Sequence, residues 1–117
     1  MKKFLLKNYI LITNIFMFAI LFCLLNVFRP IVVQGQSMEP TFKTGDILLC
    51  NTLKNPEIGD IVVIRPFIAV GEKYIIKRIT NIKDDKIFVE GDNKDNSYDS
   101  RNFGYIEIDQ ILGVVLQ

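Results

Sequence analysis

Histidine is absent from this chain of 117 residues, and cysteine occurs only at Cys23 and Cys50. Without histidine the chain has no Ser-His-Asp or Cys-His catalysis and no His-ligated metal site. Two cysteines are too few for a disulfide scaffold or a four-cysteine zinc site, and their separation does not predict a pairing. The 14 Lys and Arg balance the 13 Asp and Glu, which argues against a nucleic-acid-binding surface. We therefore expect no metal, no cofactor and no nucleic-acid partner.

One long apolar segment dominates the N-terminal part of the chain. Residues 9–28, YILITNIFMFAILFCLLNVF, carry no charge, and 20 residues in a helix cover about the 30 Å hydrocarbon layer of a bilayer. The run is longer than the apolar region of a secretory signal peptide, and it ends at Arg29 and Pro30 without a small-residue cleavage site. The pattern predicts a tail over 1–8, an uncleaved transmembrane anchor over 9–28 and one domain over 29–117.

The charges that flank the apolar run predict its orientation. Lys2, Lys3 and Lys7 precede the run, whereas only Arg29 follows it closely. The positive-inside rule then keeps the N-terminus in the cytoplasm. We expect a single-pass protein of the cytoplasmic membrane, with the domain over 29–117 on the extracytoplasmic side.

The rest of the chain alternates short β-branched runs with turn-forming residues. No 3.6-residue period, internal repeat or low-complexity tract interrupts this pattern. The predicted strands are Ile31–Val33, Asp46–Asn51, Asp60–Arg65, Tyr74–Ile82, Lys86–Glu90 and Ile108–Leu116. The fold class is therefore mainly β, a small antiparallel β-domain on one N-terminal transmembrane helix.

Serine is scarce, so the positions of Ser37, Ser97 and Ser100 are informative. Ser37 follows an apolar run through Gly35 and precedes a turn that contains proline. This context presents a hydroxyl at the lip of a sheet, with its backbone N–H free to face a reacting carbonyl. In a chain without histidine, the neutral-pH base would be a lysine that burial has stripped of its proton.

Lys77 is the lysine that fits this requirement best. The other nine lysines precede the apolar run or lie in and beside turns. Period-2 alternation puts Lys77 on the same strand face as Ile75 and Ile79, where an ammonium is poorly solvated. Alternation alone leaves a second interpretation open, a snorkelling lysine on an edge strand, because Arg78 also has Ile76 beside it.

Behind the apolar run the chain reads, in this order, GQSMEPT, Gly45-Asp46-Ile47, GDIVVIRP, Lys77-Arg78-Ile79 and GDNKDNSYDSRNFG. This series of strings resembles the bacterial type I signal peptidases, which are membrane-anchored serine endopeptidases with a Ser-Lys dyad. Each string alone is weak, whereas the combination is specific and spans nearly the whole chain. The fold that the resemblance implies is the small β-domain of that family.

The resemblance also implies the roles of individual residues. In this family the Ser of Ser-Met-x-Pro-Thr is the nucleophile, here Ser37, and the Lys of Lys-Arg-Ile is its general base, here Lys77. The Ser of the last string, here Ser97, holds the lysine amine by a hydrogen bond. Asp99 and Arg101 correspond to an ion pair that supports the site.

Other residues of the two motifs are expected near the site: Gly35, Met38, Pro40, Asp92 and Asn93. Met38 and residues 31–33 are candidates for lining the substrate pockets. Asp92 and Asn93 match the start of the last string; the alternative for this pair is a β-turn with Asx hydrogen bonds, and the two interpretations are compatible.

The chain departs from the family pattern at two places. Many members have a serine at the position of Gly35, and its side chain helps to form the oxyanion hole, so Ser37 N–H must act alone or with another donor. A Gly-x-Pro-Gly turn usually follows Lys77-Arg78-Ile79, whereas this chain has Asp84-Asp85, which predicts a tighter hairpin.

The function that the resemblance implies is removal of signal peptides from exported preproteins through an acyl-enzyme on Ser37. The implied substrates carry small residues, usually Ala, at the first and third positions before the cut and bind as an added β-strand. Two alternatives stay open, a maturase dedicated to one substrate and an anchored β-module that only binds peptides. A catalytically inactive subunit is disfavoured by the presence of both Ser37 and Lys77, and a self-cleaving repressor by the anchor.

Overall fold

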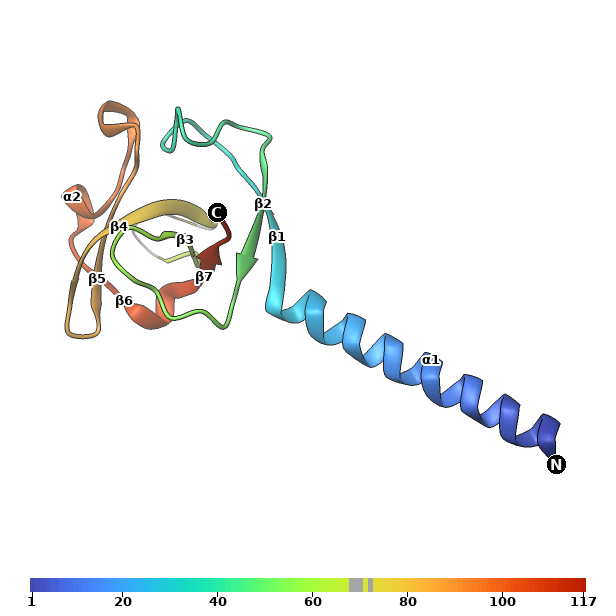
Figure 1. Ribbon diagram of the computed structural model, residues 1–117. Coiled ribbons are helices and arrows are strands. Elements are labelled where there is room, and N and C mark those ends of the chain that lie inside the picture. The colour runs from blue at the N-terminus through green and yellow to red at the C-terminus, as the bar shows by residue number, and fades with distance from the viewer. Residues whose placement is uncertain (68–70, 72) are drawn as a thin grey trace.

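The computed structural model describes residues 1–67, 71 and 73–117, which form one long helix and a β-domain. Helix α1 (Lys2–Val27) projects away from the domain, and the molecule extends over 70 Å along its long axis (Figure 1). The strands are β1 (Phe28–Val32), β2 (Ile47–Asn51), β3 (Ile61–Ile64), β4 (Ile75–Lys83), β5 (Lys86–Glu90), β6 (Ile106–Glu107) and β7 (Ile111–Val115). The short helices are η1 (Lys94–Asn96), α2 (Ser100–Phe103) and η2 (Ile108–Gln110).

The strands form one curled antiparallel sheet. Their order is β1-β2-β7-β3-β4-β5-β6, and every pairing along it is antiparallel. Figure 1 shows the sheet curling on itself, with its central strands β3 and β7 in the middle of the domain. The predicted fold class, a small antiparallel β-domain behind one N-terminal helix, is confirmed.

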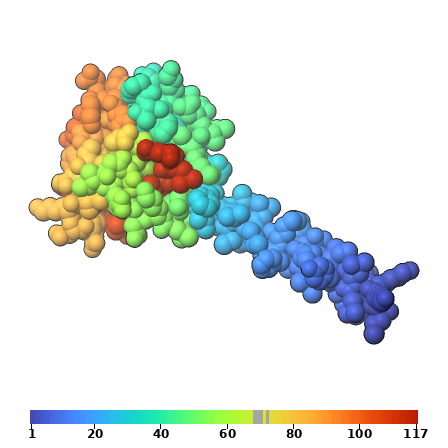
Figure 2. All heavy atoms as spheres, viewed as in Figure 1, coloured from blue at the N-terminus to red at the C-terminus, as the bar shows by residue number. Residues whose placement is uncertain are grey.

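Helix α1 begins and ends earlier than the predicted anchor over 9–28. It takes in most of the predicted tail, and Phe28 is already the first residue of β1, in an extended conformation with φ −106° and ψ 112°. Pro30, two residues on, lacks the N–H that a helix would need. None of the α1 residues is buried against the domain, and the helix is long and apolar enough to cross a membrane (Figure 2).

Two apolar clusters stabilise the domain, one on each face of the curled sheet. All four residues of β3 are buried, because this central strand is covered on both faces. One cluster contains Val33, Met38, Leu48, Cys50, Ile61, Val63, Ile76, Leu112 and Val115. The other contains Val62, Ile64, Ile79, Ile87, Val89, Ile106 and Val114.

Four of the six predicted strands agree with β2, β3, β4 and β5 to within one residue at each end. The hairpin between β4 and β5 turns through Asp84 and Asp85 alone, with Asp84 at φ 57°. This is the tighter hairpin that the sequence predicted. The predicted strand Ile108–Leu116 is in fact η2 followed by β7. Strand β6 and the one-turn helix α2 were not predicted, since two and four residues are too short for a periodic signal.

Candidate active site

Ser37 lies in the loop between β1 and β2, and the loop is fixed through its carbonyl groups. The Gly35 carbonyl accepts a hydrogen bond from Thr44 Oγ1 at 2.9 Å, and the Gln36 carbonyl accepts one from Asn93 Nδ2 at 3.0 Å. The Ser37 carbonyl accepts a bond from the Asn93 N–H at 2.8 Å. Among the hydrogen bonds of the described residues, the Ser37 N–H has no partner. It is therefore free to donate to an incoming carbonyl.

Gly35 has φ +86°, a left-handed conformation that a residue with a side chain adopts only under strain. A Cβ built there would meet no atom within 4 Å. The space is open, so backbone conformation rather than crowding favours glycine at this position. Gly35 therefore offers no side-chain donor for an oxyanion, unlike the serine that many members of the family have at this position.

Lys77 lies in the first half of β4, paired with Val62 of β3, and its residue is only 4% exposed. The neighbours Ile76 and Ile79 are buried as well. Burial lowers the pKa of the Lys77 amine; Asp99 raises it in part and Arg101 lowers it. Of the two interpretations left open by alternation, the structure therefore favours the buried lysine over the snorkelling one.

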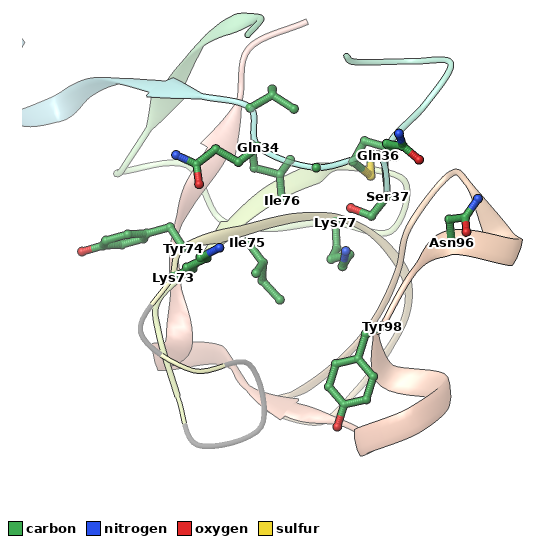
Figure 3. A pocket seen from close by; sticks show the side chains of 13 residues that line it. Gln34, Gln36, Ser37, Lys73, Tyr74, Ile75, Ile76, Lys77, Asn96 and Tyr98 are labelled. Atoms are coloured by element: carbon green, nitrogen blue, oxygen red, sulfur yellow. The ribbon is translucent and has the colours of Figure 1, made fainter. Parts of the chain in front are cut away.

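Ser37 and Lys77 meet in the wall of one cavity of about 410 Å³. Figure 3 shows the Ser37 hydroxyl and the Lys77 amine directed into it from two different segments, the β1–β2 loop and β4. The complete lining is Val33, Gln34, Gly35, Gln36, Ser37, Met38, Lys73, Tyr74, Ile75, Ile76, Lys77, Asn96 and Tyr98. A buried amine and a half-buried serine hydroxyl that line one cavity provide the two groups that proton transfer from a serine requires.

Ser97, Asp99 and Arg101 form one hydrogen-bonded network beside this cavity. Ser97 Oγ donates to Asp99 Oδ2 at 2.6 Å and accepts from the Gly91 N–H at 3.2 Å. Arg101 Nε donates to Asp99 Oδ1 at 3.0 Å, and Arg101 Nη2 donates to Asp99 Oδ2 at 3.1 Å. The predicted ion pair between Asp99 and Arg101 is thus present in the structure.

Asp99 is fully buried and stays ionised because its oxygens accept many hydrogen bonds. Burial by itself raises the pKa of this carboxyl, but the bonds from Arg101, Ser97 and the Gly91 N–H outweigh burial and hold the pKa well below its usual range. Since the Ser97 O–H donates its hydrogen bond to Asp99 and Ser97 Oγ accepts one bond from the Gly91 N–H, one lone pair of Oγ remains for the Lys77 amine. A Ser97–Lys77 hydrogen bond is not among the contacts of the described residues, and this bond stays a prediction.

Arg78 and Thr41 are site residues that the sequence did not single out. Both bind Asp92: Arg78 donates to both carboxylate oxygens at 2.9 Å, and Thr41 Oγ1 donates to Oδ2 at 2.6 Å. Asp92 therefore ties β4 to the loop of Ser37 rather than capping a turn. Asn93 accepts the turn bond from the Asn96 N–H, but its main role is to hold the two carbonyls at Gln36 and Ser37.

Gly91 is a further residue that sequence reasoning missed. A Cβ at this position would lie 2.5 Å from the Ser37 carbonyl oxygen and closer still to Ser97 Oγ. Only glycine lets these two groups approach each other across the site. The feature of the sequence that could have identified Gly91 is its position at the start of the string Gly91-Asp92-Asn93.

The remaining predicted positions lie around the cavity at different distances. Met38 and Val33 are buried and line it. Ile31 and Val32 line an adjoining hollow instead. Pro40 follows a cis peptide bond in the turn after Ser37 and is not part of the lining. Within the described residues, no group of three His, Cys, Asp or Glu side chains is placed to hold a metal ion.

Residues 29–116, which include the whole β-domain except Phe28 and Gln117, match the family model described as Peptidase S24-like. The chain belongs to this peptidase family. It is 31% identical to the mitochondrial inner membrane protease subunit 1 of Xenopus tropicalis over 106 aligned positions, which cover 71% of this chain and 64% of that protein. It is 28% identical to signal peptidase I of Bacillus caldolyticus, with 76% of this chain and 78% of that protein covered.

A third relative is the probable signal peptidase I-2 of a Synechocystis species, 28% identical over 69% of this chain and 58% of that protein. The resemblance to type I signal peptidases is thereby confirmed. The chain spans less than two thirds of the length of two of these three relatives. Together with α1, these S24-like relatives indicate a membrane-anchored protein.

Proposed function

We propose that this S24-like protein is a membrane-bound serine endopeptidase that removes N-terminal signal peptides from exported preproteins. The observation that carries the proposal is the shared cavity of Ser37 and Lys77, in which the lysine is buried and its pKa is lowered by that burial. A lysine whose neutral form is favoured by burial is a competent base for a serine hydroxyl.

The proposed reaction has two steps through an acyl-enzyme. Neutral Lys77 takes the proton of Ser37 as the hydroxyl attacks the scissile carbonyl, and the new oxyanion receives a hydrogen bond from the Ser37 N–H. Lys77 then gives its proton to the leaving amine. A water molecule, deprotonated by Lys77, finally attacks the acyl-enzyme; the bond between the acyl carbon and Ser37 Oγ breaks, Lys77 returns the proton to Oγ, and the signal peptide is released with a free carboxylate.

Ser97 and Asp99 are proposed as the residues that orient the base. Asp99 accepts a hydrogen bond from the Ser97 hydroxyl, which fixes the direction of that O–H and leaves a lone pair of Ser97 Oγ for the lysine amine. Arg101 keeps Asp99 ionised in turn. The network thereby favours one position of Lys77 without itself contacting the substrate.

The pairing of β4 supports the proposal that a substrate binds as an added strand. Residues 75–78 of β4 pair with β3, whereas pairing with β5 begins only at Arg78. The side of residues 75–77 that faces away from β3 therefore has unpaired backbone groups, and these residues line the cavity. An extended peptide can pair there and pass its scissile bond in front of Ser37.

The position of the site close to α1 suits a membrane-inserted substrate. Only five residues of β1 and four of the following loop separate α1 from Ser37, a reach of at most about 30 Å when extended. With the N-terminus in the cytoplasm, this reach places the site just outside the bilayer. Signal sequences end in that region, with their cleavage site outside the apolar segment.

The test is incubation of the full chain, in detergent micelles or lipid vesicles, with a preprotein that carries an Ala-x-Ala cleavage site. Wild-type protein should release the mature protein with its new N-terminus after the second Ala, and the Ser37→Ala variant should not. Binding of the preprotein by both proteins without cleavage would instead favour the anchored peptide-binding module. Cleavage of one natural substrate, together with inactivity on Ala-x-Ala preproteins, would favour the dedicated maturase.

A further inference from the structure

The catalytic cavity continues toward α1 as two more hollows. The adjoining one is lined by Pro30, Ile31, Val32, Gln34, Lys73 and Tyr74. The next is lined by Leu25, Arg29, Pro30, Ile31, Tyr74 and Leu112. Tyr74 borders all three, so the two hollows adjoin the side of the Ser37 cavity that is nearer the end of α1.

The other margin of the cavity carries a second exposed tyrosine, Tyr98. Figure 3 shows Tyr74 and Tyr98 well apart, with Ser37 and Lys77 between Tyr74 and Asn96 in this view. Tyr98 belongs to the lining although its residue is 55% exposed. The two tyrosines thus border different margins of the cavity: Tyr74 lies on the margin shared with the hollows beside α1, and Tyr98 lies on the margin next to Asn96.

The Tyr98 ring is held in place from behind. Its centroid lies 5.4 Å from that of Phe103 at an interplanar angle of 60°, and Phe103 meets Phe67 edge-on at 5.4 Å and 83°. Phe67 and Phe103 in turn pack against a core cluster. An exposed aromatic ring that packs against a second ring, which is itself packed against a third, offers a flat apolar surface with little entropy left to lose on binding.

The position of the membrane indicates which margin of the cavity binds the residues before the cut and which binds the residues after it. The apolar segment of a signal sequence precedes the cut and lies in the bilayer, as α1 does. Residues before the cut therefore approach along the hollows beside α1 and pass Tyr74. The residue after the cut then lies beyond Ser37 and Lys77, where Asn96 and Tyr98 form the wall.

We infer that Tyr98 forms a subsite for the first residue after the scissile bond and that this subsite takes an apolar or flat side chain. The inference rests on the proposed function, because it assumes that Ser37 attacks the substrate. Tyr98 contributes its ring surface, while its hydroxyl is not required. Selectivity at this position should therefore depend on the aromatic ring and be insensitive to loss of the hydroxyl.

The experiment measures kcat/KM of the full chain in detergent micelles on four peptides with the same Ala-x-Ala segment. Their first residue after the cut is Leu, Phe, Ser or Asp. We expect wild-type protein to prefer Leu and Phe over Ser and Asp by about three- to tenfold, the range of an aromatic contact. Tyr98→Phe should keep this ratio, and Tyr98→Ala should bring it close to one.

Tyr74→Ala is the matched control, since it removes an exposed ring from the margin of the cavity that is nearer α1. It should leave the Leu-to-Ser ratio unchanged and alter instead the preference for residues before the cut. Because each result is a ratio within one protein, a general loss of activity in a variant does not affect it.

The outcomes separate the two claims. Wild-type cleavage with an unchanged ratio in Tyr98→Ala overturns the subsite and leaves the proposed function standing. A ratio that changes equally in Tyr98→Ala and Tyr74→Ala also overturns it. No cleavage of any peptide by wild-type protein, or full cleavage by Ser37→Ala, overturns the proposed function and the subsite together.

Discussion

Arg78 and Asp92 form a bidentate ion pair, in which Nε donates to Oδ1 and Nη2 donates to Oδ2, both at 2.9 Å. Arg78 follows Lys77 in β4, and Asp92 precedes Asn93, whose N–H holds the Ser37 carbonyl. The pair therefore connects the strand that carries the proposed base to the loop that fixes the proposed nucleophile. Its partial burial makes it worth more than an ordinary surface pair.

Asp92→Ala should lower the free energy of unfolding by about 1–3 kcal/mol, because Arg78 and the Thr41 hydroxyl both lose a charged acceptor. Its kcat should fall as well, since Lys77 and Ser37 are no longer held together. Urea unfolding and peptide cleavage measure the two effects. Lys86→Ala, which breaks the exposed 3.8 Å pair with Glu107, is the control and should stay within about 0.5 kcal/mol. Equal effects of the two variants would contradict the connecting role.

Gly91→Ala should damage activity more than its small volume suggests. The new Cβ would lie 2.5 Å from the Ser37 carbonyl oxygen, so the loop of Ser37 or the loop of Ser97 must move. We expect a loss of about 1–3 kcal/mol of stability, typical of overpacking, and a large fall in kcat. Gly104→Ala is the control: it strains a backbone at φ +81° but meets open space, so it should cost stability and keep kcat. Normal kcat in Gly91→Ala would show that the close approach is not needed.

Asp99→Asn places an amide where every neighbour donates. Oδ1 accepts from the Arg101 N–H and Nε, and Oδ2 accepts from Ser97 Oγ, the Gly91 N–H and Arg101 Nη2. In either orientation the amide NH₂ therefore faces donors in a buried site, and we expect a loss of about 2–4 kcal/mol at neutral pH.

The stability difference between wild type and Asp99→Asn should depend on pH with a defined sign. The folded pKa of Asp99 is depressed, so its contribution is present above the unfolded value of about 3.9 and declines as pH falls toward the folded pKa. Unfolding curves should thus show a constant difference from about pH 5 to 8 and a smaller one below pH 4. A difference that grows on acidification would mean that Asp99 is not the group responsible.

The sequence was informative where chemistry and local pattern coincide. A serine in a turn and a lysine on an apolar strand face could be identified as candidates because period-2 alternation is a local property. The Arg78–Asp92 pair joins residues 14 positions apart through the curl of the sheet, and nothing local in either string indicates it. Helix α2 has one signal, the Asp99–Asn102 capping box, but four residues give no period.

Topology is testable without any assay of activity. With Lys2, Lys3 and Lys7 on the cytoplasmic side of α1, protease added outside intact cells or spheroplasts should digest the domain that follows Phe28 and spare the N-terminal tail. Immunoblots against tags at the two ends would measure this. Protection of a C-terminal tag, with digestion of an N-terminal one, would reverse the orientation and remove the basis for a secretory substrate.

Few groups besides Lys77 can control the rate of this enzyme near neutral pH. The chain has no histidine, and the α-amino group lies at the far end of α1. Cys50 is buried, and burial raises the pKa of its thiol, an effect that Arg29 only partly opposes. The pKa of Lys77 is shifted in the opposite direction: burial lowers it, because burial favours the neutral amine.

We therefore expect kcat/KM to rise with pH and reach a plateau on the alkaline side, because the neutral fraction of Lys77 grows until deprotonation is complete. The midpoint should lie below the unperturbed lysine pKa of about 10.4, in line with the lowered pKa. The Cys50→Ala variant should show the same rise of kcat/KM with pH, with the same midpoint. Lys77→Arg, which stays charged at every accessible pH, should be inactive throughout, and Ser37→Ala combined with Lys77→Ala should be no slower than either single variant. An active Lys77→Arg protein, or a limb that shifts in Cys50→Ala, would show that another group is the base.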